Sequence, residues 1–156
     1  MSYSWLKFLH LVASLLFVGV HGASMVVFYA IRRETDRSRI QALLSISAKT
    51  VMPMYISLGL VVVSGVVVGR RVDAFHNQWG WMSVGLLAVI SVLMYLLAKP
   101  LHRRVLAACE LRPSGVPRIS DEELHKVLRS PQVHLITAIG VAGLAALVYL
   151  MSFQPF

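Results

Sequence analysis

The chain has 156 residues, of which 57% are hydrophobic and 14% are charged, and its net charge is +8. Soluble domains are usually about half apolar and about a quarter charged, so this composition predicts a protein that lies in a lipid bilayer. The basic residues fall between apolar runs, a pattern of membrane topology that requires no polyanion. We therefore expect the bilayer, and no nucleic acid, as the partner.

Four apolar runs predict four transmembrane helices, at about residues 4–31, 50–69, 79–98 and 131–153. Each run has the ~20 residues that a helix needs to cross a ~30 Å hydrocarbon core. In lipid only helices and closed barrels satisfy the backbone, and the runs lack the alternation of barrel strands. The sequence predicts an all-α, antiparallel four-helix membrane bundle that forms one domain over residues 1–156.

The connections also carry helix signals. Residues 34–47 have an apolar face, so they form a helix that either lies on the membrane or extends the second span. After a break at residues 112–117, Ser120 and Glu123 form a capping box that starts a short helix to about Leu128. Ser130 is the expected N-cap of the fourth span, with Pro131 at its first helical position.

The charge distribution predicts the orientation of the helices. Of the 15 Lys and Arg residues, all but Lys7, Arg70 and Arg71 lie in the segments 32–49 and 99–129. The positive-inside rule places these two segments in the cytoplasm, so both termini are expected outside it. Cys109, His102 and His125 fall in the second basic segment, where we expect an inert thiol and two solvated imidazoles.

Ionisable side chains inside a membrane are candidates for functional residues because they are expensive to bury there. His10 and His21 are eleven residues apart on the first span and share one helical face with Phe17 and Ser24. Two imidazoles from different helices can clamp a haem iron. The candidate axial pairs are His21 with His134, whose depths differ by about 9 Å, and His10 with His76.

Two other interpretations of these residues stay open. His21 with Met52 and Met54 would form a copper site, because imidazole and thioether ligands favour Cu(I). Alternatively, His10 caps the outer interface, and His21 forms a hydrogen bond across the bundle to a serine or a carbonyl. No span contains a carboxylate, and the sequence shows no nucleotide-binding loop, zinc-protease motif or other catalytic signature.

The segments Trp5-Leu6-Lys7-Phe8-Leu9-His10, Gly19-Val20-His21-Gly22-Ala23-Ser24 and residues 32–47 carry a family resemblance. They resemble the first two helices of small bacterial four-helix membrane proteins of the copper-resistance protein D (CopD)-like superfamily. This superfamily includes the haem-binding HemJ-type protoporphyrinogen oxidases, and His10 is similar to the histidine on their first helix. The resemblance implies a bacterial cytoplasmic membrane and, for any enzyme activity, a haem-dependent oxidoreductase.

The leading hypothesis is a b-type haem protein for electron transfer or haem handling, with His21 and His134 as ligands and His10 as an alternative. A second hypothesis is an accessory subunit of a larger respiratory or photosynthetic complex, or a homo-oligomer. Such a subunit would pack through Gly65 and Gly69, whose small-xxx-small spacing allows close helix approach. Copper handling is the third.

Overall fold

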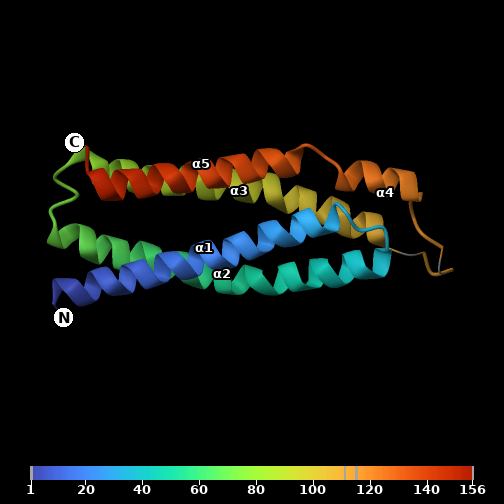
Figure 1. The fold of residues 1–156 in the computed structure, drawn as a ribbon, viewed down its shortest axis with the longest axis horizontal. Helices are drawn as coiled ribbons and strands as arrows, with labels where there is room; N and C mark the ends of the chain where they lie inside the picture. Colours follow the sequence, from blue (N-terminus) through green and yellow to red (C-terminus); the bar gives the residue numbers. More distant parts are fainter. Residues whose placement is uncertain (1, 111, 115, 156) are drawn as a thin grey trace.

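The computed structural model describes residues 2–110, 112–114 and 116–155. Four long helices run antiparallel, namely α1 (Tyr3–Ile31), α2 (Arg37–Arg71), α3 (Gln78–Cys109) and α5 (Gln132–Phe153), and the short helix α4 (Asp121–Leu128) precedes α5 (Figure 1). All four long helices fall in segments long and apolar enough to cross a membrane, which confirms the predicted helical bundle. Both chain ends lie at one end of the bundle, here called the terminal end, opposite the α4 end.

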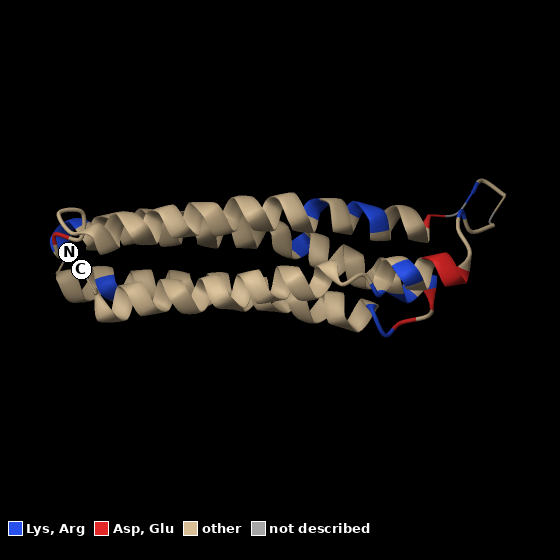
Figure 2. Cartoon of the chain, turned by 90° about the horizontal axis from the view of Figure 1, so that it is seen from above, with Lys and Arg blue, Asp and Glu red and all other residues tan. Residues whose placement is uncertain are grey.

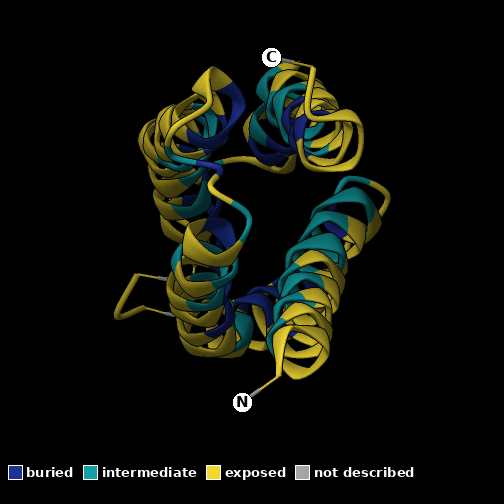
Figure 3. Ribbon diagram, turned by 90° about the vertical axis from the view of Figure 1, so that its left-hand side faces the viewer, coloured by how far each residue is buried: buried dark blue, intermediate teal, exposed yellow. Residues whose placement is uncertain are grey.

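The long helices pack as two hairpins. Helix α1 lies along α2, and α3 lies along α5, whereas α2 and α3 contact each other much less (Figure 3). Only 6–17% of each apolar span is buried within the chain. Large side chains such as Leu15 (72% exposed) and Val63 (65% exposed) cover the outside. An apolar surface of this extent is expected only where lipid, in place of water, surrounds the helices.

Two helices continue beyond their apolar spans toward the α4 end. Helix α2 begins at Arg37, so residues 37–47 extend the second span and do not form a separate surface helix. Asp36 caps it by accepting the backbone N–H of Ser38 at 2.8 Å, and the hydroxyl and N–H of Ser38 hold the pKa of Asp36 below its usual value. Helix α3 continues past Pro100 to Cys109, well beyond the predicted end of the third span at about residue 98.

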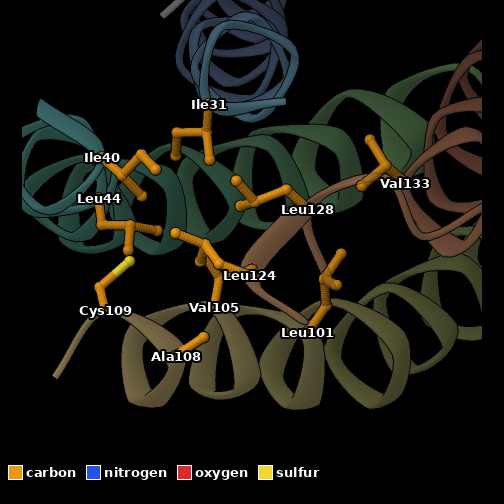
Figure 4. Packing of buried hydrophobic residues seen from close by; sticks show 10 residues of the cluster. All are labelled: Ile31, Ile40, Leu44, Leu101, Val105, Ala108, Cys109, Leu124, Leu128 and Val133. Atoms are coloured by element: carbon orange, nitrogen blue, oxygen red, sulfur yellow. The ribbon is translucent and has the colours of Figure 1, made fainter. Parts of the chain in front are cut away.

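The α4 end contains the main hydrophobic core. Ten buried residues from all five helices and their ends pack there (Figure 4), namely Ile31, Ile40, Leu44, Leu101, Val105, Ala108, Cys109, Leu124, Leu128 and Val133. The buried positions of α3 recur every three or four residues, which explains why the helix continues after its apolar span ends. This part of the chain packs like a small soluble protein.

The short helix α4 has the predicted capping box. The N–H of Glu123 donates to Ser120 Oγ, and the N–H of Ser120 donates to the Glu123 carboxylate, both at 3.2 Å. The start of α5 differs by one residue from the prediction. Pro131 is its cap residue and Gln132 its first residue, while Ser130 Oγ accepts the N–H of Gln132 at 3.3 Å.

The start of α2 caps the end of α3. Arg37 donates to the carbonyl oxygens of Ala108 and Ile119 and to the carboxylate of Asp121, each at 2.8 Å. Gln41 donates to the carbonyl of Cys109 at 2.8 Å. The last carbonyls of a helix have no partner within it, so these side chains satisfy groups that would otherwise be unpaired. Arg37 with Gln41 is called the α2–α3 clamp below.

The two imidazoles expected to be solvated in the basic segment are packed against other residues, because that segment is folded, whereas the inert thiol expected at Cys109 agrees with its burial. His102 lies on α3, half-buried, with its ring edge-on to Phe28 at 6.3 Å between centroids. His125 lies on α4, and its Nδ1 is buried without a hydrogen-bond partner among the described residues. Cys109 is fully buried at the end of α3, so its thiol is shielded by packing and does not lie in a solvated loop.

We predict that Arg37→Ala lowers the free energy of unfolding by about 2 kcal/mol, because hydrogen bonds to a charged group contribute about 1.5–3 kcal/mol. The Arg37 side chain is only 14% exposed, so water replaces its contacts poorly. The change should appear in thermal unfolding in detergent and in faster labelling of Cys109 by a maleimide. The matched control is Arg39→Ala, whose side chain is 73% exposed and which should change stability by less than about 0.5 kcal/mol. Equal labelling rates in both variants would contradict the clamp.

At the terminal end, a tight turn joins α2 to α3. The N–H of Ala74 donates to the carbonyl of Gly69 at 2.9 Å, and the indole of Trp81 donates to the carbonyl of Phe75 at 3.0 Å. Gly80 packs directly against the backbone of Ala74, so a Cβ there would overlap its carbonyl group.

Gly80→Ala should therefore destabilise the protein by about 1–3 kcal/mol, since a backbone carbonyl must move to admit the methyl group. Gly85→Ala on the same helix is the control, because nothing lies within 4 Å of the point that its new methyl group would occupy. We expect the control to melt at or slightly above the temperature of the parent protein. If Gly80→Ala melts at the same temperature as the control, the turn adjusts to the methyl group without cost and the prediction is wrong.

Candidate functional site

His10 connects α1 to α2. Its Nδ1 lies 2.9 Å from Ser64 Oγ, and its ring covers Gly65, where a Cβ would lie 3.1 Å from His10 Cε1. The Ser64 hydroxyl also lies close to the carbonyl of Leu60 and donates to it. With the hydroxyl proton on Leu60, Ser64 Oγ accepts from Nδ1–H, and this tautomer of His10 leaves a lone pair on Nε2. The serine thus orients the ring in the way that outer partners orient metal-binding histidines.

Ser24 forms a second polar contact between these helices. Its hydroxyl lies 2.7 Å from Thr50 Oγ1. His10 and Ser24 are 14 residues apart on α1, and their partners Ser64 and Thr50 are 14 apart on α2, so the two contacts share one register. Gly65 and Gly69 are covered within the chain, by His10 and by Phe75. The small-residue pair expected to pack against a partner is therefore used inside the molecule.

His21 points toward the other hairpin. Its ring stacks on Phe17 of the same helix, with 5.8 Å between centroids and an interplanar angle of 16°. His21 Nε2 lies 3.5 Å from the point where Gly140 of α5 would carry a Cβ, and Met94 Cε of α3 lies 3.6 Å from that point. The His21 imidazole and the terminal methyl group of Met94 therefore lie near the same point beside Gly140, a place called the His21–Met94 site below.

Within the described residues, no group hydrogen-bonds to the imidazole of His21. A hydrogen bond across the bundle to a serine was one of the alternatives expected for His21, but it is His10 that forms such a bond. Met94 was not singled out, because its role depends on a contact between three helices that no local pattern records. The sequence could not reveal this site, because α1, α3 and α5 each contribute one residue to it and only the folded chain brings them together.

His134 has another partner. Its Nδ1 lies 2.9 Å from the hydroxyl of Tyr29. His134 precedes Gly140 by six residues on α5. Six residues of helix correspond to about 9 Å. Because His21 lies beside Gly140, His21 and His134 both lie between α1 and α5 but differ in depth by about this distance. Metal–imidazole bonds of about 2 Å require two axial nitrogens to be only about 4 Å apart. Joint ligation of one iron would need α1 and α5 to slide.

The remaining candidates lie apart from one another. His76 is 86% exposed in the turn, 3.6 Å from Asp73. Met52 is 69% exposed and faces outward, while Met54 is half-buried. The α1–α2 register sets both methionines near the depth of His21, but the side chain of Met52 points toward lipid.

The described residues contain no group of three or more His, Cys, Asp and Glu side chains that could hold a metal ion. The His21–Met94 site thus offers two donors only. Imidazole with thioether is an axial set used for haem iron in cytochromes, and it also suits Cu(I). The donor chemistry fits either group.

Comparison of the chain with protein-family models, with curated proteins and with solved structures finds no match. The resemblance to the CopD-like superfamily therefore stays a prediction.

Ser64→Ala should weaken the α1–α2 hairpin by about 0.6 kcal/mol, with about 1.7 kcal/mol as the upper bound for hydrogen bonds between membrane helices. The loss follows because the contact between His10 Nδ1 and Ser64 Oγ, which joins α1 to α2, is removed. Ser91→Ala is the matched control, since that hydroxyl donates only to Leu87 of its own helix. Unfolding in mixed micelles measures both variants, and a control that loses as much stability would refute the role of His10.

Proposed function

We propose that this protein is a b-type haem-binding protein of a bacterial cytoplasmic membrane that serves electron transfer or haem handling, with His21 as an axial ligand. The observation that carries the proposal is an imidazole in the middle of an apolar span with no hydrogen-bond partner among the described residues. A polar group without a partner in lipid is costly, so a bound group that uses its lone pair compensates the burial.

The surrounding residues support a flat cofactor. Phe17 stacks on His21 and limits rotation of the ring. Gly140 has no side chain, so it places no atom at the point that lies 3.5 Å from His21 Nε2 and 3.6 Å from Met94 Cε. The two hairpins contact each other much less than the helices within each hairpin do. Less packing must therefore be displaced to place a planar ring between them. When bound, haem iron would supply one-electron chemistry.

His10 and His134 are the alternative ligands in this proposal. The ring of His10 is held by Ser64 through Nδ1, so Nε2 is the nitrogen that would bind a metal, and His134 lies on the same helix as Gly140. The residue types at the α4 end support the orientation, because all but three of the 15 Lys and Arg residues lie in its segments (Figure 2). The positive-inside rule then assigns that end to the cytoplasm and both termini to the other side.

The test is an absorption spectrum and a pyridine haemochrome assay of protein purified in detergent after haem-replete expression. The parent protein should show a Soret band and about one haem per chain. His21→Ala should lose most of the haem because it removes an axial donor. Gly140→Leu should lose haem as well, since its side chain fills the point where His21 and Met94 converge.

His76→Ala is the control, because that side chain is 86% exposed in the turn, and it should keep the haem of the parent. His10→Ala separates the alternatives. If His10→Ala loses haem and His21→Ala does not, His10 is the ligand. A parent protein without a Soret band refutes the proposed function.

The nearness of the Met94 side chain, whose methyl Cε lies close to the same point as His21 Nε2, favours a second candidate, a Cu(I) site that would also use the Met94 sulfur. Metal analysis of the same sample distinguishes the two. Copper that co-purifies without a Soret band and is lost in Met94→Leu would support copper handling. Met52→Leu is its control, because Met52 faces outward.

A further inference from the structure

A shallow pocket of about 280 Å³ opens between α3 and the α4–α5 connection at the α4 end. Its lining residues are Leu101, Arg104, Lys126, Val127 and Ser130. The lining combines two cations and a hydroxyl with two apolar side chains. A pocket of this composition suits an anionic group that is attached to an apolar body.

The charges of the pocket are available to a ligand. Arg104 is exposed and forms no ion pair with any residue that the structure describes. Lys126 pairs with Glu122 at 3.0 Å, but both side chains are mostly exposed, at 73% and 80%, and such surface pairs contribute little. Arg32 donates to the carbonyl of Ser130 at 2.6 Å, which brings a second guanidinium, and a third cation, next to the pocket.

The depth of the pocket matches the headgroup layer of a bilayer. The apolar run of α3 ends at Ala98, and Leu101 and Arg104 follow it by three and six residues, or about 5 and 9 Å of helix. The headgroup regions add roughly 5–8 Å on each side of the hydrocarbon core. The acidic residues of α4, Asp121 to Glu123, lie farther from the spans, at its start (Figure 2).

We propose that this pocket binds the phosphate headgroup of an anionic phospholipid, with Arg104 and Lys126 contacting the phosphate and Ser130 donating a hydrogen bond. Leu101 and Val127 then contact the glycerol and the first carbons of the acyl chains. Basic pockets between membrane helices recognise anionic lipids through this combination of charge and depth. This site is independent of the His21–Met94 site.

The experiment measures lipid binding to the full chain by native mass spectrometry and by thermal shift in a neutral detergent. Phosphatidylglycerol is the test lipid and phosphatidylcholine the zwitterionic reference, while glycerol 3-phosphate tests whether a free phosphate suffices. We expect the parent protein to retain phosphatidylglycerol in preference to phosphatidylcholine and to ignore glycerol 3-phosphate at equal concentration. The double variant Arg104→Gln with Lys126→Gln should bind phosphatidylglycerol roughly 5-fold more weakly for each charge removed.

Two controls make the result specific. Arg70→Gln with Arg71→Gln removes two cations at the terminal end, where both lie at the end of α2, and should leave binding within about 2-fold. Arg104→Lys with Lys126→Arg keeps both charges and should also retain binding, so a general loss of folding would be recognised. Equal binding by the double variant and the parent, equal losses in either control, or competition by glycerol 3-phosphate would each overturn the proposal.

Discussion

The α2–α3 clamp is the interaction on which the placement of the other helices depends. The apolar spans bury few residues against each other, so packing within the membrane does little to fix the two hairpins relative to one another. At the α4 end, Arg37 and Gln41 bind the last carbonyls of α3 above a core of ten buried residues. Eight of these ten residues lie outside the predicted apolar runs, so the hydrophobic effect, which hardly acts between helices in lipid, can hold the hairpins together there.

The polar contacts within the spans have a different role, because they set depth. His10 with Ser64 and Ser24 with Thr50 fix the register of α1 on α2 at two levels. Tyr29 with His134 fixes α1 against α5. These bonds hold His21 level with Gly140 and Met94, so the only intramembrane imidazole without a hydrogen bond among the described residues lies where the hairpins meet. The candidate site is thus a product of helix register.

The sequence predicts the spans because their length must match the hydrocarbon thickness, and it predicts the start of α4 because Ser120 and Glu123 form a local motif. It does not predict the continuation of α3 to Cys109, because that part of the helix is stabilised by contacts of Leu101, Val105 and Ala108 with helices distant in the sequence. The same limit applies to the candidate site. His21 could be found as an ionisable residue in an apolar run, but Met94 resembles any packing methionine until three helices are brought together.

The long separation of the clamp partners has a consequence for the order of assembly. Arg37 and the carbonyl of Ala108 are 71 residues apart in the chain, and Asp121 is farther still. The first hairpin, whose partners are adjacent in sequence, can therefore enter the bilayer and pair before α3 has been synthesised. Arg37 stays a solvated cation during this time and helps to hold its end of α2 out of the hydrocarbon. The joint between the hairpins closes only when translation has passed α3, so the domain is completed last at the end that stays in water.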